Sequence, residues 1–333
     1  MIVLGIETSC DDTSAAVYDG NKLLSNVVST QLVHRNFGGI VPELASRAHI
    51  QLISSVVTQA LEHAHLEPKQ IDGLAVTYGP GLAGSLLVGL SMAKGLALSL
   101  NKPLVGVNHL EGHLFANRLE HPDLSPPFLV LIVSGGHTQL VHVKDWGDYT
   151  ILGRTRDDAA GEAFDKVSKL LGLGFPGGPL IEKTAKTGNP KAIRFPKANI
   201  KDHPLDFSFS GLKTAVLNHV QSLDPKTLSE AIPDIAASFQ EAVVSVLIRN
   251  LIRASEETGL KKAGLSGGVA INSILRARLQ DSANKHGLQV FWPSPVFCSD
   301  NGAMIACAGH YYLSSGQTSS LGISPKPSLN FDS

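Results

Sequence analysis

Two histidines four positions apart, His109 and His113, are the residues of this chain best suited to hold a metal ion. If the segment is helical, residues at i and i+4 share one face, so both imidazoles point the same way. Such a pair binds one divalent ion and leaves positions for a carboxylate and a substrate. The same spacing also occurs in surface and capping pairs. The peptidase pattern H-E-x-x-H needs Glu after the first His, where this chain has Leu110, so a protease is not indicated.

Asp300 is the carboxylate that could complete such a metal site. It precedes an apolar stretch, residues 303–308, that we expect to be a helix. Taken in isolation, Asp300 is expected to cap that helix. If it lies beside His109 and His113 instead, the three form a two-histidine, one-carboxylate face with open positions.

Composition is typical of a folded protein with a sizeable core. The chain has 333 residues, 43% hydrophobic and 17% charged, which is enough for two domains. A net charge of −1 excludes a globally basic nucleic-acid-binding protein but not a local basic patch. Three cysteines cannot form a disulfide framework, and the N-terminus lacks signal-peptide features, so we expect a cytoplasmic protein. Only residues 81–100 look long enough to span a bilayer, and their glycines and Lys94 favour a buried helix.

One arrangement of elements is repeated along the chain. The first copy is expected to have strands at 2–7, 14–18, 22–29 and 73–77, then a glycine turn and a helix ending at 100. The second copy is expected to have strands at 128–133, 139–143 and 263–265, then a glycine turn and a helix at 270–280. This predicts an α/β fold of two lobes, residues 1–127 and 128–333, with an irregular insertion at about 172–214. The final helix is a candidate to pack back on the first lobe.

Glycine pairs follow two of the apolar strands, in Ser134-Gly135-Gly136 and in Ser266-Gly267-Gly268. Without Cβ atoms, such turns let a phosphate approach the backbone amides, although Gly-Gly is also common in tight hairpins. Asn272 follows the second turn and is suited either to donate to a ribose or base or to cap the next helix. Neither turn is a Walker loop, because no Gly-Lys-Ser/Thr ends either of them.

An acidic helix start and a basic segment lie in the second half. Asp158, Glu162 and Asp165 share one helix face, where acids normally complement the helix dipole and face solvent. Their apolar neighbours leave room for one of them to bind a hydroxyl-rich ligand. The adjacent sequence at 175–179, Phe-Pro-Gly-Gly-Pro, is suited to a rigid wall. Residues 183–201 carry six basic side chains and no acid, a candidate contact for a phosphate backbone that could equally be solvated.

Motifs spread over nearly the whole chain resemble one family, the catalytic subunit of tRNA adenosine threonylcarbamoyltransferase. They are VLGIETSCD at 3–11, GIVPELASR at 39–47, HLEGH at 109–113, VSGGHT at 133–138, DAAGEAFD at 158–165, FSFSGLKT at 207–214 and DNGAM at 300–304. The resemblance, to the bacterial form, implies the actin, hexokinase and heat-shock-chaperone ATPase (ASKHA) fold. It implies two duplicated actin-like lobes, each a mixed sheet flanked by helices, with a cleft between them.

The resemblance also implies a reaction and its site. A threonylcarbamoyl group passes from threonylcarbamoyl-AMP to the exocyclic amine of the adenosine 3′ to the anticodon, in tRNAs reading codons that begin with A. By motif match the metal ligands are His109, His113 and Asp300, with iron ahead of zinc as the ion. The adenylate contacts are Ile132, Val133, Ser134, Gly135, Gly136, Asp165 on the ribose side, Gly178 and Asn272, and ATP or ADP would use the same cleft.

The expected partners are tRNA, a paralogous subunit of the same fold docking on the helix at Gly81 to Leu100, and a small ATPase subunit, with no membrane. The amine of adenosine is a poor nucleophile, so a base must take its proton as the bond forms. Asp11 is the candidate base, and capping of its own loop is the equally supported alternative. The target base must also leave its stack to react.

Three other functions fit parts of the chain. A sugar-type kinase or ATPase of the same superfamily would use ATP, Mg²⁺ and an acidic base, without a histidine-pair metal site. A metallopeptidase fits His109 and His113 but not Leu110. A non-catalytic scaffold would use the small-residue helix at Gly81 to Leu100 as a docking face, which is compatible with catalysis.

Overall fold

The computed structural model of the protein describes residues 1–331, except the side chains of Arg35 and Asn36. The chain divides into two compact units. The first runs from Met1 to Leu124 and resumes at Pro293, and the second runs from Ser125 to Trp292.

The first unit is a five-stranded sheet in the order β3-β2-β1-β4-β5. Its strands are β1 (Val3–Glu7), β2 (Asp12–Tyr18), β3 (Leu23–Thr30), β4 (Gly73–Gly79) and β5 (Leu104–Asn108). Its helices are α1 (Pro42–His63), α2 (Ala83–Leu100), α3 (His109–Glu120), α9 (Pro295–Cys298) and α10 (Gly302–Ser314), with 3-10 turns η1 (Leu32–Phe37) and η2 (Pro68–Gln70). β1 pairs antiparallel with β2 and parallel with β4.

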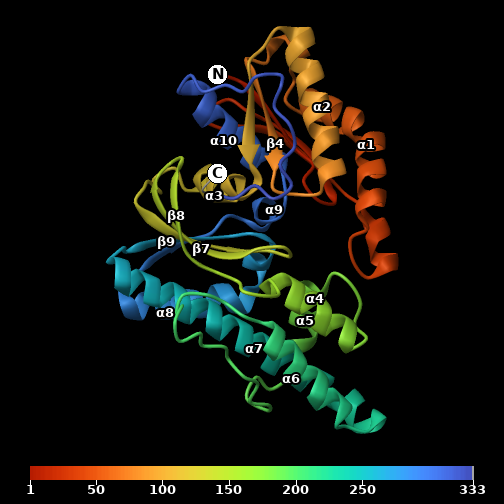
Figure 1. Ribbon diagram of the computed structural model, residues 1–333, viewed down its shortest axis with the longest axis vertical. Coiled ribbons are helices and arrows are strands. Elements are labelled where there is room, and N and C mark those ends of the chain that lie inside the picture. The colour runs from red at the N-terminus through yellow and green to blue at the C-terminus, as the bar shows by residue number, and fades with distance from the viewer. Residues whose placement is uncertain (332–333) are drawn as a thin grey trace. The chain divides into compact units, whose positions relative to one another are not determined.

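Alternation along β1 sends side chains to two different helix layers. Leu4 and Ile6 are fully buried in a core that α1 and α2 complete. Gly5 faces the opposite side, where α10 packs on the sheet. Figure 1 shows the two layers, with α1 and α2 on one side of β4 and α10 on the other.

The second unit repeats the same topology. Its strands are β6 (Phe128–Val133), β7 (Thr138–Asp145), β8 (Asp148–Arg154), β9 (Lys262–Ser266) and β10 (Gln289–Phe291). The sheet order β10-β9-β6-β7-β8 matches the first sheet strand for strand, with β6 antiparallel to β7 and parallel to β9. Its helices are α4 (Ala160–Leu170), α5 (Gly177–Ala185), α6 (Ser210–Gln221), α7 (Pro225–Thr258) and α8 (Ser273–His286), with the 3-10 turn η3 (Gly268–Ile271). The duplicated α/β fold expected from the sequence is therefore confirmed.

Several boundaries differ from those expected. The expected division after residue 127 lies close to the observed one after Leu124, and the chain from Pro293 onward, which contains the final helix named as a candidate to pack back, groups with the first unit. The helix expected from Ala270 begins at Ser273, because Gly267 at φ 90° leads into η3 first. The segment expected to be irregular at 172–214 contains α5 and the start of α6.

Helix α10 joins the first sheet because it presents almost no side-chain bulk to it. A Cβ on Gly302 would lie 2.7 Å from the carbonyl carbon of Ala15, and one on Gly309 would lie 2.1 Å from Cβ of Ala75. On the strand side, a Cβ on Gly5 would lie 2.4 Å from the backbone nitrogen of Ala306. Helix and sheet therefore touch backbone to backbone, and larger residues cannot occupy these positions without displacing one of the two.

Two helices of the described chain, α2 and α7, are long and apolar enough to cross a membrane by length and composition. The sequence reading named only the first of them and was wrong on this point. The apolar window of α7 is 67% buried inside the structure, as expected for a core helix. In α2 only 33% of the window is buried, and Leu98 is 72% exposed. The expectation that α2 is buried is thus met on one face only.

We predict that Gly309→Ala destabilises the protein by about 1–3 kcal/mol, because the new methyl group overpacks the contact with β4. The matched control is Gly95→Ala in α2, where an added Cβ meets no atom within 4 Å. That control should stabilise by up to about 1 kcal/mol through helix propensity alone. Urea unfolding followed by circular dichroism measures both, and equal effects of the two substitutions would contradict the packing argument.

Candidate metal centre and nucleotide-binding turns

Helix α3 begins at the first histidine. β5 ends at Asn108, whose side-chain oxygen accepts a hydrogen bond from the Leu110 amide at 2.9 Å and so caps the helix. His109 and His113 then stand one turn apart on one face, with ring centroids 4.8 Å apart. Both are buried, His113 completely. Glu111 points elsewhere, as expected, and accepts a hydrogen bond from the Tyr312 hydroxyl.

Asp300 faces both imidazoles. Its Oδ1 lies 3.5 Å from Nε2 of His109 and 3.3 Å from Nε2 of His113. The three possible ligand atoms lie within 4.8 Å of one another. Capping of α10 by Asp300, the alternative reading, is wrong, because Asn301 does this by accepting from the Met304 amide at 3.0 Å. All three residues belong to the first unit.

A second carboxylate, Glu7 at the end of β1, holds His109 from behind. Its Oε2 lies 3.0 Å from Nδ1 of His109 and accepts from the Thr77 hydroxyl at 2.6 Å. Its Oε1 accepts from the amide of Ser9 at 2.5 Å, and the side chain is fully buried. In the neutral imidazole, a carboxylate at Nδ1 favours the tautomer with its proton there, and the lone pair of Nε2 then faces Asp300. The sequence analysis gave Glu7 no role, although an acid ending an apolar strand is a usable signal.

The surroundings of His113 fit a metal ion. Neither ring nitrogen has a hydrogen-bond partner within the described residues, since the approach of Asp300 lacks hydrogen-bond geometry. A completely buried polar group without a partner is costly, and a cation at Nε2 would remove the cost there. Two imidazole nitrogens and one carboxylate oxygen form a donor set that suits first-row transition metals such as iron and zinc.

Charges in this buried cluster shift one another's titration. Burial lowers the pKa of His109, but the carboxylates of Asp300 and Glu7 outweigh it and raise that pKa to about 9. Burial raises the pKa of Glu7, yet its interactions with His109 prevail and the pKa lies below its usual range. Burial and the nearby Asp300 raise the pKa of Asp12 to about 7. The same two causes raise the pKa of Asp11.

Asp11, the expected base, lies half-buried in the turn between β1 and β2. Its backbone carbonyl accepts from the Gln31 amide at 3.1 Å. No observation tests its catalytic role, which stays a prediction. The neighbouring Asp12 was not singled out from the sequence. Its buried Oδ1 has no hydrogen-bond partner among the residues described.

In the second unit the two glycine turns meet at one sheet edge. β6 and β9 run parallel side by side, so their carboxyl ends lie together. A Cβ on Gly267 would lie 2.4 Å from the carbonyl oxygen of Val133. The Ser134 amide donates to the His137 carbonyl at 2.8 Å, which closes a tight turn. The amides of Gly135 and Gly136 donate to no acceptor in the described part of the chain and have open space beside them.

Ile132 and Val133 are fully buried in β6, and their contact with the adenylate stays a prediction. Helix α4 begins against the same turn, where the amide of Gly161 donates to the Ser134 carbonyl at 3.1 Å. Helix N-termini and exposed amides together form a site for anions.

Asp165 of α4 accepts a hydrogen bond from the amide of Gly177, the first residue of α5, at 2.6 Å. The structure thereby brings it beside Gly178, where an added Cβ would meet nothing within 4 Å. The other two acids of the helix face have structural partners. Lys166 bonds Asp158 at 2.7 Å and Glu162 at 2.8 Å. The expected solvated face holds for Glu162, whose side chain is 44% exposed, and not for Asp158, at 14%.

Asn272 caps α8, because its side-chain oxygen accepts from the Leu275 amide at 2.9 Å. Its amide nitrogen donates to Oε1 of Gln240 at 2.8 Å. The capping alternative is therefore confirmed. Contact of Asn272 with a ribose or base stays a prediction. For the Asn272 amide nitrogen to donate to such a ligand, its hydrogen bond to Gln240 would have to break.

Comparison with known proteins identifies the family. Residues 22–307 match the TsaD family model, described as tRNA N6-adenosine threonylcarbamoyltransferase. A protein of that name from Clostridium perfringens (strain ATCC 13124) is 54% identical over 330 residues, covering 98% of this chain and 97% of the relative. Another from Clostridioides difficile (strain 630) is 53% identical, covering 100% and 99%. The chain belongs to the tRNA N6-adenosine threonylcarbamoyltransferase family.

Solved structures outside this transferase family share its fold. HypF of T. kodakarensis superposes with a TM-score of 0.65 at 16% identity, covering 95% of this chain and 48% of HypF. Component A of (R)-2-hydroxyglutaryl-CoA dehydratase from Acidaminococcus fermentans gives 0.55 at 15%, covering 93% and 98%. At this identity the likeness shows the fold alone, which is of the ASKHA type expected from the sequence.

For the metal-free form of this family member we predict a loss of thermal stability as pH rises from 6.5 to about 9. The folded-state pKa of His109 lies above its ordinary 6.5, so its contribution is complete below pH 6.5 and disappears as pH passes through about 9. Glu7 stays ionised throughout this window, and Asp12, whose pKa of about 7 lies at the lower end of the window, adds to the decline only there.

Thermal unfolding in the presence of chelator at several pH values measures this slope. His109→Gln should flatten it, and the matched control His63→Gln, at an exposed position of the same unit, should not. An equally steep decline in His109→Gln would contradict the assignment.

Proposed function

We propose that this chain transfers the threonylcarbamoyl group of threonylcarbamoyl-AMP to the exocyclic amine of the adenosine 3′ to the anticodon, in tRNAs that read codons beginning with A. One observation carries the proposal, the 54% identity that extends over 98% of this chain and 97% of a relative bearing the corresponding name. The acceptor position and the donor follow from the resemblance of the motifs. The same proposal places the enzyme in the cytoplasm.

The metal centre is part of the proposal. His109, His113 and Asp300 would hold one divalent ion, iron ahead of zinc. Two observations support this: the possible ligand atoms of the three residues lie within 4.8 Å of one another, and the ring nitrogens of His113 have no hydrogen-bond partner among the described residues. When bound, such an ion supplies positive charge that polarises a carbonyl or phosphate oxygen of a substrate. Glu7 keeps Nε2 of His109 turned toward Asp300, and Thr77 and Ser9 hold Glu7 in place.

The donor is already activated, since it contains a carbamoyl-phosphate anhydride, so the protein has chiefly to position it. The open amides of Gly135 and Gly136, next to the start of α4, suit its phosphate. We assign Asp165 and Gly178 to the ribose side and Asn272 to the base or ribose. ATP or ADP would use the same amides.

Transfer requires the adenosine nitrogen to attack the carbamoyl carbon while the carbon–oxygen bond to phosphate breaks and AMP leaves with that electron pair. The proton of the amine must pass to a base, for which we retain Asp11. Asp12 is the second candidate, because a carboxyl with a pKa of about 7 is well matched to proton transfer near neutral pH.

Helix α2 is proposed as the docking face for a paralogous subunit of the same fold. Leu87 is 54% and Leu98 72% exposed on it, and a large apolar surface of this kind favours a protein partner. A small ATPase subunit is proposed from the resemblance alone.

The activity is tested by incubating the protein with threonine, bicarbonate, ATP, the upstream synthase and unmodified tRNA, followed by nucleoside mass spectrometry. The reaction is run with and without candidate partner subunits. We expect the wild type to form threonylcarbamoyladenosine. The double variant His109→Ala with His113→Ala should form the product at least about 100-fold more slowly, because both nitrogen ligands are removed. The control His63→Ala with His65→Ala removes two exposed histidines of the same unit. Undiminished modification by the first pair would refute the metal assignment, and no product from any wild-type mixture would refute the function.

We predict that Glu7→Gln weakens metal binding about 10–100-fold, since it removes the charge that orients His109 while keeping the side-chain shape. Competition with a chromophoric chelator measures the affinity. The matched control is Glu43→Gln, whose side chain is 74% exposed on α1. Wild-type affinity in Glu7→Gln, with an unchanged circular dichroism spectrum, would show that this carboxylate does not support a metal ligand.

A further inference from the structure

The basic segment between α5 and α6 is fixed to α7 at regular intervals. The Asn189 amide donates to Asp234 at 2.7 Å, and the Ile193 amide donates to the hydroxyl of Ser238 at 3.1 Å. Farther along, Nζ of Lys197 donates to the hydroxyl of Ser245 at 2.9 Å. The three α7 residues lie on one face of that helix, so each anchors a successive part of the segment. Although it forms no helix or strand between residues 186 and 209, the segment has a defined path.

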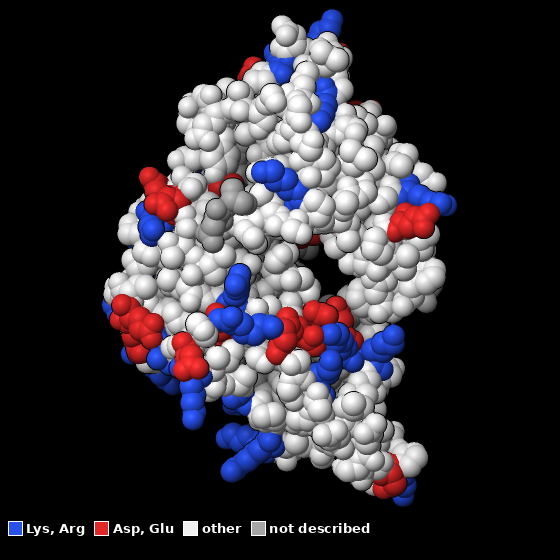
Figure 2. Space-filling model, viewed as in Figure 1, with Lys and Arg blue, Asp and Glu red and all other residues white. Residues whose placement is uncertain are grey.

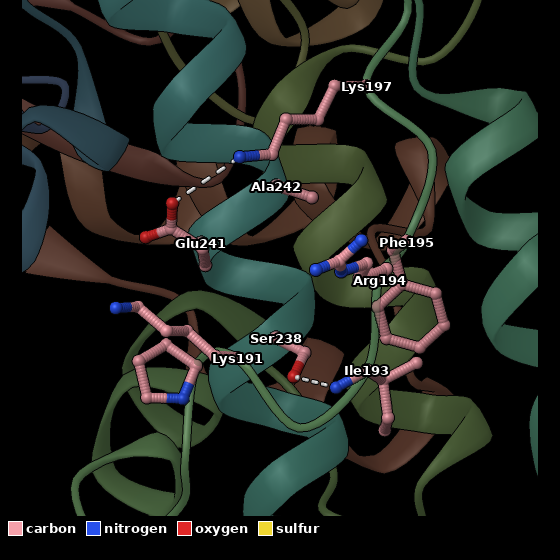
Figure 3. Close-up of a pocket in the computed structure, with 9 residues that line it drawn as sticks. Lys191, Ile193, Arg194, Phe195, Lys197, Ser238, Glu241 and Ala242 are labelled. Carbon is pink, nitrogen blue, oxygen red and sulfur yellow. Dashed lines mark hydrogen bonds and ion pairs between the residues drawn. The ribbon is translucent and has the colours of Figure 1, made fainter.

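Between the segment and α7 lies a pocket of about 470 Å³, which we call the basic groove. It is lined by Lys191, Ile193, Arg194, Phe195, Glu241 and Ala242, among others. Figure 3 shows the three cations that line this pocket, Lys191, Arg194 and Lys197, beside α7, with Glu241 joined to Lys197. A second pocket, of about 230 Å³, shares Lys197 and continues toward the start of α6. The two pockets are thus neighbours along the segment.

The positive charge in the basic groove is only partly neutralised. Its one lining acid, Glu241, already bonds Arg278 and lies 3.4 Å from Lys197. Lys191 uses its backbone amide to donate to Oδ1 of Asn189 at 3.0 Å. The side-chain nitrogens of Lys191 and Arg194 form no ion pair or hydrogen bond with any residue within 1–331. Other cations of this unit do have carboxylate partners, as Lys166 has in Asp158. Figure 2 shows basic side chains projecting together below α7, near the green segment of Figure 1.

The basic groove has positively charged side chains but few groups that could recognise a specific ligand. The ring of Phe195 is 8% exposed and packs edge-on against His219 at 6.0 Å, so it provides no face for base stacking. The hydroxyl of Ser238 is already engaged by the segment's backbone. Cations without a stacking platform suit the sequence-independent phosphates of a nucleic acid better than a nucleotide base.

We propose that the basic groove binds the phosphate backbone of the tRNA, with Lys191 and Arg194 making direct phosphate contacts. This inference rests on the proposed function, which supplies the RNA. Lys183, Lys186 and Lys201, exposed at either end of the segment, extend the same row of charge. The contacts position the RNA and carry no sequence information.

The test uses a double variant of the full chain that carries both Lys191→Ala and Arg194→Ala, and compares it with the wild type. Fluorescence anisotropy with unmodified tRNA gives the dissociation constant at several salt concentrations. We expect about tenfold weaker binding at low salt and a salt slope reduced by about two, one for each phosphate contact removed. In the modification assay KM for tRNA should rise while kcat stays near wild type. A second double variant, Lys191→Arg with Arg194→Lys, keeps both positive charges and should bind tRNA with nearly wild-type affinity.

The matched control is Lys226→Ala with Lys261→Ala, which removes the same charge from exposed positions of the same unit. Wild-type affinity and salt slope in the groove variant, from a wild type that modifies tRNA, would overturn this inference and leave the function standing. A groove variant that binds tRNA normally but has lost ATP binding would also overturn it, in favour of a small phosphorylated ligand. A wild type that binds tRNA through the groove but never modifies it would refute the function instead.

Discussion

The backbone contact between α10 and the first sheet is the constraint on which the metal centre depends. Gly5, Gly302 and Gly309 let helix and strands approach until no side chain fits between them. Asp300 stands just before this helix, so its position relative to α3 is set by that contact. A methyl group on Gly309 would lie 2.1 Å from Cβ of Ala75, so helix or sheet would have to move by roughly 1–1.5 Å to restore an ordinary contact. A shift of that size would disturb the 3.3–3.5 Å that separates Asp300 from the imidazoles. The packing of α10 on the sheet thus determines the position of Asp300 relative to the two histidines.

The cluster around His109 shows how buried charge is tolerated in this fold. Glu7 is removed from water entirely, yet three donors from different elements reach it, namely His109, Thr77 and Ser9. Each bond offsets part of the cost of desolvation. His113 has no such support among the described residues. That asymmetry between two neighbouring histidines is what a metal ion would resolve, because it can bind Nε2 of both.

The two sheets share a topology and use it for different chemistry. Glu7 ends β1 opposite Ser14 of β2, and Val133 ends β6 opposite Thr138 of β7, so the two positions correspond. A carboxylate stands there in the first unit and an apolar residue in the second, where the following Gly135 and Gly136 expose amides instead. One strand end therefore carries groups suited to a cation, and the other carries groups suited to an anion. The duplication fixes where the chain turns, and the residues in each turn decide what it binds.

The sequence by itself determined the local features, because they depend on residues close in the chain. The apolar strands, the i, i+4 histidine pair and the glycine turns could all be predicted directly, and the family followed from the motifs. Tertiary structure alone decided that Glu7 reaches His109 across 102 residues, and that Asn301 takes the cap and leaves Asp300 to the imidazoles. It also decided that Asn272 is occupied by Gln240 and that the chain after Trp292 returns to the first unit. Such contacts arise from the closing of α10 and α7 onto their sheets, which no local pattern encodes.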